Sequence, residues 1–222
     1  MKDLVENTLT RSRSLIEAGD IESAIKLLRS AYTDRPTNRD LAYEFGHVLG
    51  EFSEDPDPHV KEQRRVECLK VFSNLCLELN DADPLEQWKI RRHFYHYSGQ
   101  HLLNRSLGYE EINRGNAQGL LSVGFGCLNH AIDLIEKNDR ADAEGFATEG
   151  RTAFEKLLLL DGSLYNRHLA YALTLAILNE TDLAIKATET AAQLKKCKPE
   201  DFQKHRATMN RLFPTKVTKE PQ

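Results

Sequence analysis

Apolar residues recur along the chain at intervals of three and four, and a polar or Pro/Gly turn interrupts them about every 20 residues. This spacing places apolar side chains on one face of an α-helix. No run of alternating β-branched residues, which is typical of strands, is present in the sequence. The pattern predicts an all-α protein of about ten helices: 2–18, 20–34, 38–52, 59–80, 84–105, 110–136, 140–160, 163–178, 181–196 and 199–212.

One segment near the N-terminus predicts how neighbouring helices pack. Ala24 and Ala31 lie two turns apart on one helical face, so a second helix can approach closely, and Leu28 fills the gap between them. Pro36 ends this helix and begins the next one. These residues therefore predict a helical hairpin after the Gly-Asp turn at 19–20.

That arrangement resembles the second half of a tetratricopeptide repeat, in which a Gly-Asp turn precedes a small, a bulky and a small residue and a closing proline. Phe45 and Gly46 stand where the family places its bulky-Gly pair in the following repeat. Near the C-terminus, residues 181–185 and Ala191 repeat the theme, with Asn179 in place of the turn glycine. The resemblance covers about half of the chain, because residues 84–160 fit helical hairpins but not the family consensus.

The resemblance implies a stack of antiparallel helix hairpins, an α-solenoid, whose concave face holds a protein or peptide. We therefore expect one tetratricopeptide-like domain over residues 1–213 and a disordered tail over 214–222. The expected function is that of an adaptor or scaffold for protein–protein interaction, and not that of an enzyme. The sequence leaves open which partner is bound and whether the chain forms a homo-oligomer.

Composition narrows the function further. The chain has 222 residues, of which 40% are apolar, and a formal net charge of -4. A mildly acidic protein lacks the broad basic field of a typical nucleic-acid binder, so we do not expect nucleic acid as a partner. The charged N-terminus has no apolar signal-peptide core, and the longest apolar run, residues 157–160, is too short to span a bilayer. We expect a cytoplasmic protein without a membrane segment.

The segment 88–101 interleaves cations with aromatic residues and holds the only tryptophan. On one helix, an apolar stripe is expected to pack into the core: Leu85, Trp88, Tyr95, Gly99 and Leu102. The adjoining cationic face is either a groove for an acidic peptide or a solvated surface. The predicted partner-binding residues, which share cationic or aromatic character, are Arg13, Tyr43, His47, Lys89, Arg92, His93 and His96.

A metal-binding helical enzyme or sensor is the alternative. His93 and His96 form one pair at ligand-like spacing, and Cys127 and His130 form another. Facing helices can assemble four such ligands around zinc. Pairs three residues apart also arise by chance in helices, so we expect no metal and interpret Cys127 as a small buried residue.

Four glycines, Gly115, Gly119, Gly124 and Gly126, fall in a short segment. Two of them fit part of a GxGxxG phosphate-binding fingerprint, but Asn129 occupies the third position and no βαβ unit surrounds it. We interpret the glycines as points where helices pack closely or begin. No Ser/His/Asp grouping or paired-carboxylate motif is present in the sequence, so we predict no catalytic residues and no cofactor.

Overall fold

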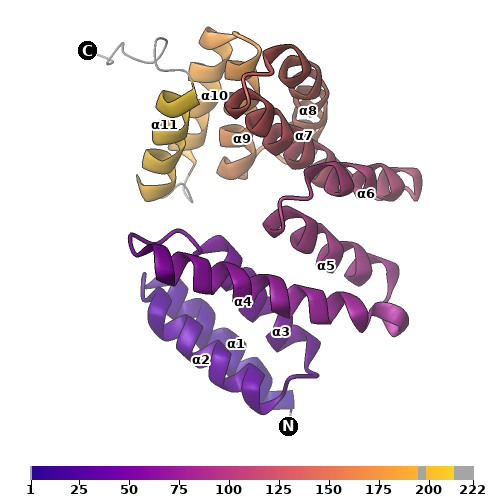
Figure 1. Cartoon of the computed structure of the whole chain (residues 1–222), viewed down its shortest axis with the longest axis vertical. Helices are drawn as coiled ribbons and strands as arrows, with labels where there is room; N and C mark the ends of the chain where they lie inside the picture. Colours follow the sequence, from indigo (N-terminus) through magenta and orange to yellow (C-terminus); the bar gives the residue numbers. More distant parts are fainter. Residues whose placement is uncertain (1, 195–198, 213–222) are drawn as a thin grey trace. The chain divides into compact units, whose positions relative to one another are not determined.

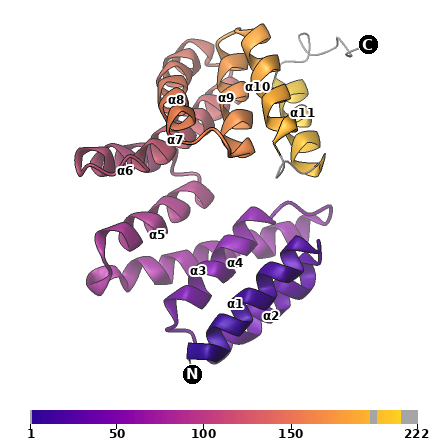
Figure 2. The same cartoon turned by 180° about the vertical axis from the view of Figure 1, so that it is seen from behind.

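The protein is all-α, as the apolar spacing predicts (Figure 1 and Figure 2). The computed structural model describes residues 2–194 and 199–212, and no strand occurs within them. The predicted tail at 214–222 lies outside the described residues. In those ranges no helix is both long and apolar enough to cross a bilayer. The described helices are α1 (Lys2–Glu17), α2 (Ile21–Asp34), α3 (Arg39–Glu51), α4 (Pro58–Leu77), α5 (Pro84–Tyr97), α6 (His101–Asn113), α7 (Gly119–Glu136), α8 (Arg140–Leu160), α9 (Tyr165–Ile177), α10 (Thr181–Gln193) and α11 (Pro199–Leu212), with a 3₁₀ turn at Leu79–Asp81.

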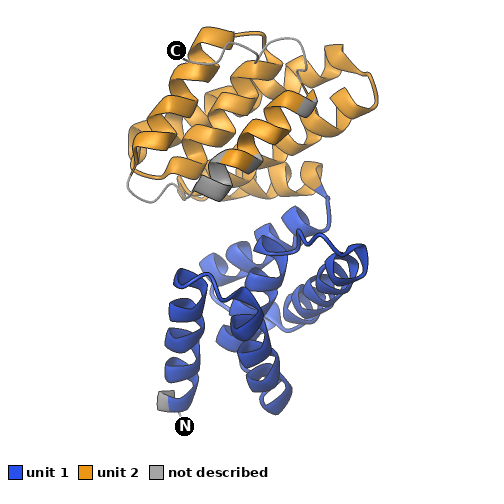
Figure 3. Ribbon diagram, turned by 90° about the vertical axis from the view of Figure 1, so that its left-hand side faces the viewer, with its two compact units in different colours: residues 1–100 blue, residues 101–222 orange. Residues whose placement is uncertain are grey.

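The chain divides into two compact units (Figure 3). Unit 1 spans residues 1–100 and contains α1 to α5, in which each helix packs on the next and α3 also contacts α5. Unit 2 spans residues 101–222. Its helices α6 to α10 likewise pack on their chain neighbours, while α11 lies against α7 and α9. The single domain expected over 1–213 stays a prediction.

The core of unit 1 follows the hairpin pattern of the sequence. Ala24 and Leu28 are fully buried in it, together with Phe45 and Phe72. One cation, Arg64, is also buried, and it pairs with carboxylates of Glu22 and Asp55 while donating to the carbonyl of Phe52. The segment between α3 and α4 is therefore fixed to the unit by a satisfied arginine.

The helices predicted over 84–105 and 110–136 are wrong, because the structure has three helices there, α5, α6 and α7. Gly99 and Gly115 have φ angles of 71° and 83°, in the left-handed region. A residue in that region ends a right-handed helix, and glycine adopts it without a steric penalty. The apolar spacing continues through both glycines, so periodicity alone does not reveal the breaks.

Five interhelical turns share one geometry. A residue with positive φ donates its N–H to the carbonyl three residues back, and the next residue donates to the carbonyl five residues back. This is the Schellman closure, which satisfies carbonyls that a helix end leaves free. Asn179 adopts a φ of 62°, so it does replace a turn glycine. The positive-φ residues of these turns are Gly19, Gly99, Gly115, Asn138 and Asn179.

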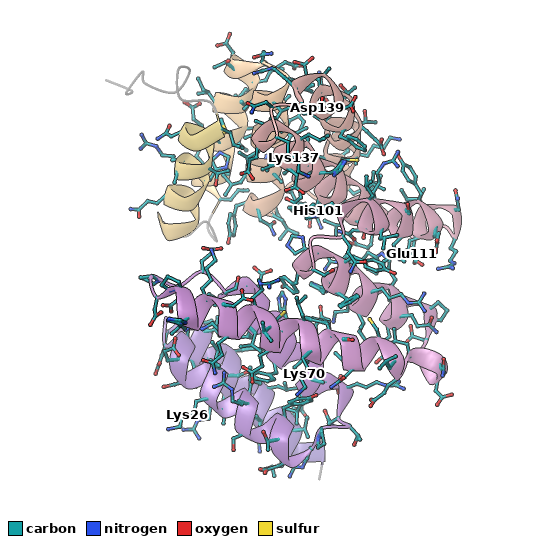
Figure 4. The ribbon with its side chains drawn as sticks, viewed as in Figure 1. Lys26, Lys70, His101, Glu111, Lys137 and Asp139 are labelled. Carbon is teal, nitrogen blue, oxygen red and sulfur yellow. The ribbon has the colours of Figure 1, made fainter. Side chains whose placement is uncertain are left out.

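Small residues let the helices of unit 2 approach closely, as we interpreted the glycine-rich segment. A Cβ atom at Gly119 would collide with the backbone oxygen of Gly108, and one at Gly126 would lie 2.8 Å from the His101 carbonyl oxygen. The turn that follows α6 is closed by Glu111, which is labelled in Figure 4 and is buried. Its two carboxylate oxygens accept hydrogen bonds from the side chains of Arg114 and Asn116, so the buried carboxylate is satisfied.

An arginine–glutamate pair joins α6 to α8. Arg105 donates through Nε and Nη2 to the two carboxylate oxygens of Glu149, at 2.6 and 2.8 Å. The Tyr109 hydroxyl donates to the same carboxylate at 2.6 Å, and the Arg105 guanidinium lies 5.3 Å from the centre of the Tyr109 ring. Arg105 is thus paired bidentately and stacked, which is a strong arrangement for an arginine.

Candidate functional site

Two helices of unit 1, α3 and α5, carry most of the predicted binding residues. The side chain of Asn38 caps α3 by accepting from the Leu41 N–H, and the side chain of Asp83 caps α5 by accepting from the N–H of Leu85 and Glu86. Both caps fix where the helices begin and hence which side chains face each other. α3 and α5 lie in contact although α4 separates them in the sequence.

Two tyrosine–histidine pairs cross from α3 to α5. The Tyr43 hydroxyl lies 3.1 Å from Nδ1 of His93, and Nδ1 of His47 lies 2.8 Å from the Tyr97 hydroxyl. The second pair is one turn further along both helices, with tyrosine and histidine exchanged. The helices therefore run in parallel with a constant register. Tyr97 also donates to the carboxylate of Glu51 at 3.0 Å.

We call the residues of this contact the α3–α5 cluster. It consists of Tyr43, His47, Glu51, Lys89, Arg92, His93 and Tyr97. The ring of Phe72, from α4, stacks against His93 with centroids 6.0 Å apart and closes the cluster from the core side.

The hydrogen bonds of His93 determine its tautomer. Its Nδ1 lies 2.9 Å from the Lys89 carbonyl oxygen, which can only accept, so Nδ1 carries the proton. Nε2 then has a lone pair and accepts from Nη2 of Arg92 at 2.9 Å. His93 is only 6% exposed, and burial together with the nearby Arg92 charge lowers the pKa of His93 to about 2. The ring is therefore neutral at physiological pH.

His47 is held in the same way. Tyr97 donates its proton to Glu51, so the hydroxyl oxygen of Tyr97 accepts from the Nδ1–H of His47. Burial lowers the pKa of His47 below the ordinary value, although the Glu51 carboxylate opposes this. Burial also raises the pKa of Tyr43 to about 12. The histidines and tyrosines of the cluster thus stay neutral around pH 7.

Arg92 differs from its neighbours because its charge is not balanced. Its hydrogen bond within the described residues is the one to His93, and its guanidinium lies 5.4 Å from the centre of the Trp88 ring. Nε is buried without a hydrogen-bond partner, and no described carboxylate forms an ion pair with the side chain. Burial lowers the pKa of Arg92 from its ordinary value. Beside it, exposed Lys89 places Nζ 4.1 Å from the centre of the Tyr43 ring.

The structure brings five of the seven predicted binding residues into the cluster and leaves two beside it. His96 contacts the ring of Tyr97, with centroids 5.2 Å apart. Arg13, on α1, pairs with Glu44 at 3.2 Å and is largely exposed. The five within the cluster are Tyr43, His47, Lys89, Arg92 and His93. Whether any of the seven contacts a partner stays a prediction.

Two expectations for α5 are wrong. His93 does not lie on an open face, because the buried face of α5 consists of Trp88, Ile90 and His93. The expected apolar stripe is buried at Trp88 but not along its length, since Leu85 is 56% exposed and Leu102 is 44% exposed. For Leu102 the physical reason is the helix end at Gly99, which places this residue on α6 and removes the turn that would have continued the stripe.

Sequence reasoning missed Glu51 and Tyr97, which complete the cluster. A signal for them was present, because Tyr43, His47 and Glu51 follow each other at intervals of four, as do Lys89, His93 and Tyr97. Residues four apart lie on one face of a helix. Two such matching rows, each with histidine and tyrosine, indicate two helix faces that pair.

The metal-binding alternative has no assembled ligand set. Both ring nitrogens of His93 are engaged, Cys127 is fully buried and His130 packs against the ring of Phe146 with centroids 4.5 Å apart. Across the part of the chain that the structure describes, no three or more His, Cys, Asp or Glu residues are grouped so that they could hold a metal ion.

Comparison with known proteins does not place the chain in a family. No family model matches it, and no curated protein matches its sequence.

Proposed function

We propose that the protein is an interaction module that binds an acidic segment of a partner protein on the face formed by α3 and α5. One observation carries the proposal: Lys89 and Arg92 lie side by side on this face, and neither forms an ion pair with a described carboxylate. A cation that its own protein leaves unpaired can complement a negative partner.

The pKa values of the cluster favour binding over acid–base catalysis. A general acid or base works best with a pKa near the operating pH. The pKa of His93 lies near 2 and that of Tyr43 near 12, because both groups are buried. Both side chains also use their polar atoms on each other. They are suited to holding the helices in register rather than to exchanging protons with a substrate.

We propose that the interaction module is a tetratricopeptide-like stack of helices, and the arrangement of unit 1 supports this. Consecutive helices pack on each other, and the parallel contact of α3 with α5 is the relation between first helices of successive hairpins. In α-solenoids such helices line one continuous surface that holds the partner. In the proposal, Lys89 and Arg92 are the residues of this surface that contact the partner.

Acidic residues near the face set a limit on the partner. Glu44 and Glu51 both belong to α3. Glu44 forms an ion pair with Arg13, and Glu51 accepts a hydrogen bond from Tyr97. An acidic segment is attracted at Lys89 and Arg92 and repelled at Glu51. We therefore propose a short acidic segment, not an extended polyanion.

A labelled peptide tests the proposal. Fluorescence anisotropy of a fluorescein-labelled octaglutamate peptide is measured with the full chain, and an octalysine peptide serves as the opposite-charge control. We expect octaglutamate to bind, with an affinity that falls as salt is raised. Lys89→Ala should weaken binding about threefold, because it removes one exposed charge.

Lys70→Ala is the matched control, since Lys70 is an exposed lysine on α4 of the same unit (Figure 4). It changes the net charge equally and should leave affinity unchanged. Equal losses in the two variants would mean that the peptide senses only overall charge. That result, or no binding of octaglutamate, would refute the proposed site.

A further inference from the structure

Arg92 differs from Arg64 and Arg167, the two buried arginines of the described residues. Arg64 pairs with the carboxylates of Glu22 and Asp55, and Arg167 pairs with Asp161 at 3.5 Å. Arg92 is also only partly exposed, yet its partners are a neutral imidazole and an indole ring. A desolvated charge is normally compensated by an opposite charge, because its hydration is lost.

The unmet hydrogen-bonding capacity of Arg92 points in the same direction. A guanidinium has five N–H donors, and in the described residues His93 takes one of them. Nε–H is buried without any acceptor. Nη1 is not among the buried atoms and forms no hydrogen bond to a described residue, so an acceptor that arrives from outside can use this exposed edge of the guanidinium.

Resting on the proposed function, we infer that Arg92 is the anchor of the site and binds one carboxylate of the partner on the exposed edge of its guanidinium. The planar fork of arginine matches a carboxylate with two parallel hydrogen bonds. Lys89, one turn away on α5, then adds a second positive charge at the exposed rim.

His93 is the positioning residue for this anchor. Its Nδ1–H is fixed by the Lys89 carbonyl and the Tyr43 hydroxyl, so Nε2 always faces Arg92 as an acceptor. The indole of Trp88 supports the guanidinium from the side. The guanidinium is therefore oriented before the partner arrives, which lowers the entropy cost of binding.

The test follows the Nε–H resonance of Arg92 by ¹H–¹⁵N NMR of the full chain. The resonance is assigned by its loss in Arg92→Lys. Octaglutamate is titrated in, and the same peptide is measured in parallel by anisotropy. We expect the resonance to shift and to saturate at the peptide concentration that saturates the anisotropy. Inorganic phosphate is titrated separately to compare oxyanions.

Affinity is then compared in two charge-conserving variants. Arg92→Lys should weaken octaglutamate binding about tenfold, because an ammonium cannot form the parallel pair of hydrogen bonds. Arg91→Lys is the matched control on the neighbouring, exposed position and should change affinity less than about twofold. Thermal unfolding checks that both variants are folded. The NMR titration itself uses the unaltered chain, and Arg92→Met, which also lacks the resonance, provides the assignment if Arg92→Lys does not fold.

The outcomes separate this inference from the proposed function. Peptide binding with an unmoved Arg92 resonance, or equal affinities of the two variants, would overturn Arg92 as the anchor while the interaction module remains. No peptide binding by the unaltered chain would overturn both. A shift with phosphate but not with octaglutamate would overturn the carboxylate as ligand.

Discussion

Two arginines, one in each unit, place the guanidinium at nearly the same distance from the centre of an aromatic ring. The guanidinium of Arg105 lies 5.3 Å from the centre of the Tyr109 ring, and that of Arg92 lies 5.4 Å from the centre of the Trp88 ring. Arg105 is held bidentately by Glu149. Arg92 has no such carboxylate among the described residues.

The difference separates a structural cation from an available one. The Glu149 carboxylate satisfies Arg105, raises its pKa above the ordinary range and ties α6 to α8. Burial lowers the pKa of Arg92, its hydrogen-bond partner His93 is neutral, and the charge of Glu51 opposes the lowering without forming an ion pair with Arg92. The charge of Arg105 is used in holding unit 2 together, whereas the charge of Arg92 remains free to attract a ligand.

The largest effect that we predict compares one buried histidine in each unit and is a loss of stability in acid. His93 belongs to the α3–α5 cluster, and its pKa is lowered to about 2, while burial lowers the pKa of His205 in unit 2 to about 4. Both folded pKa values lie below the value of about 6.5 in an unfolded chain. Stability is therefore complete above pH 6.5 and is lost as pH falls, by about 1.4 kcal/mol per unit for each group.

Urea unfolding between pH 7 and 4.5 measures this loss, which amounts to about 3 kcal/mol per histidine at the lower end. His93→Gln and His205→Gln should each flatten the pH dependence. His59→Gln is the control at an exposed position and should leave the slope as it is. Unchanged slopes in the first two variants would show that neither ring is held neutral by the fold.

The second prediction concerns packing in unit 2. Gly119→Ala places a methyl group against the backbone oxygen of Gly108, which cannot rotate away. We expect a loss of about 2–3 kcal/mol in the free energy of unfolding. Gly145→Ala on α8 meets no atom within 4 Å and should instead stabilise the helix by about 0.5–1 kcal/mol.

In unit 1 the corresponding change acts on the cluster. Gly50→Ala would collide with the ring of Tyr97, a side chain that can turn, and not with backbone. Its cost in stability should therefore be smaller than that of Gly119→Ala. Because Tyr97 holds His47 and Glu51, the variant should also disturb the NMR signals of the cluster. Equal costs for both variants would contradict the difference in packing between the units.

The apolar spacing of the sequence was sufficient to predict the fold class and most helix ends. Turn residues such as Asn179 could be recognised because they replace a glycine at a known position. The breaks at Gly99 and Gly115 could not, since a glycine within an apolar period is compatible with either a continuous helix or a left-handed turn.

At the candidate site, residue type predicted which side chains lie close together but not which of them are buried. Tyr43 and His93 were found because cations and aromatic residues mark α3 and α5, yet His93 was expected on an open face. Whether a histidine is exposed or buried depends on the rotation of α5 about its axis. That rotation is set by contacts with α3 and α4, which are distant in the sequence.

The smallest expected effect is the most direct test of the two arginines. Arg105→Met leaves the Glu149 carboxylate without its bidentate partner and should cost about 1–2 kcal/mol in the free energy of unfolding. Arg92→Met removes a partly desolvated charge that has no carboxylate, although Nε2 of His93 loses its donor. The gain and the loss should offset each other to within about 0.5 kcal/mol. Urea unfolding of the two variants beside the unaltered chain measures both values. If Arg92→Met costs as much as Arg105→Met, then Arg92 is already satisfied in the free protein, and its charge is not reserved for a partner.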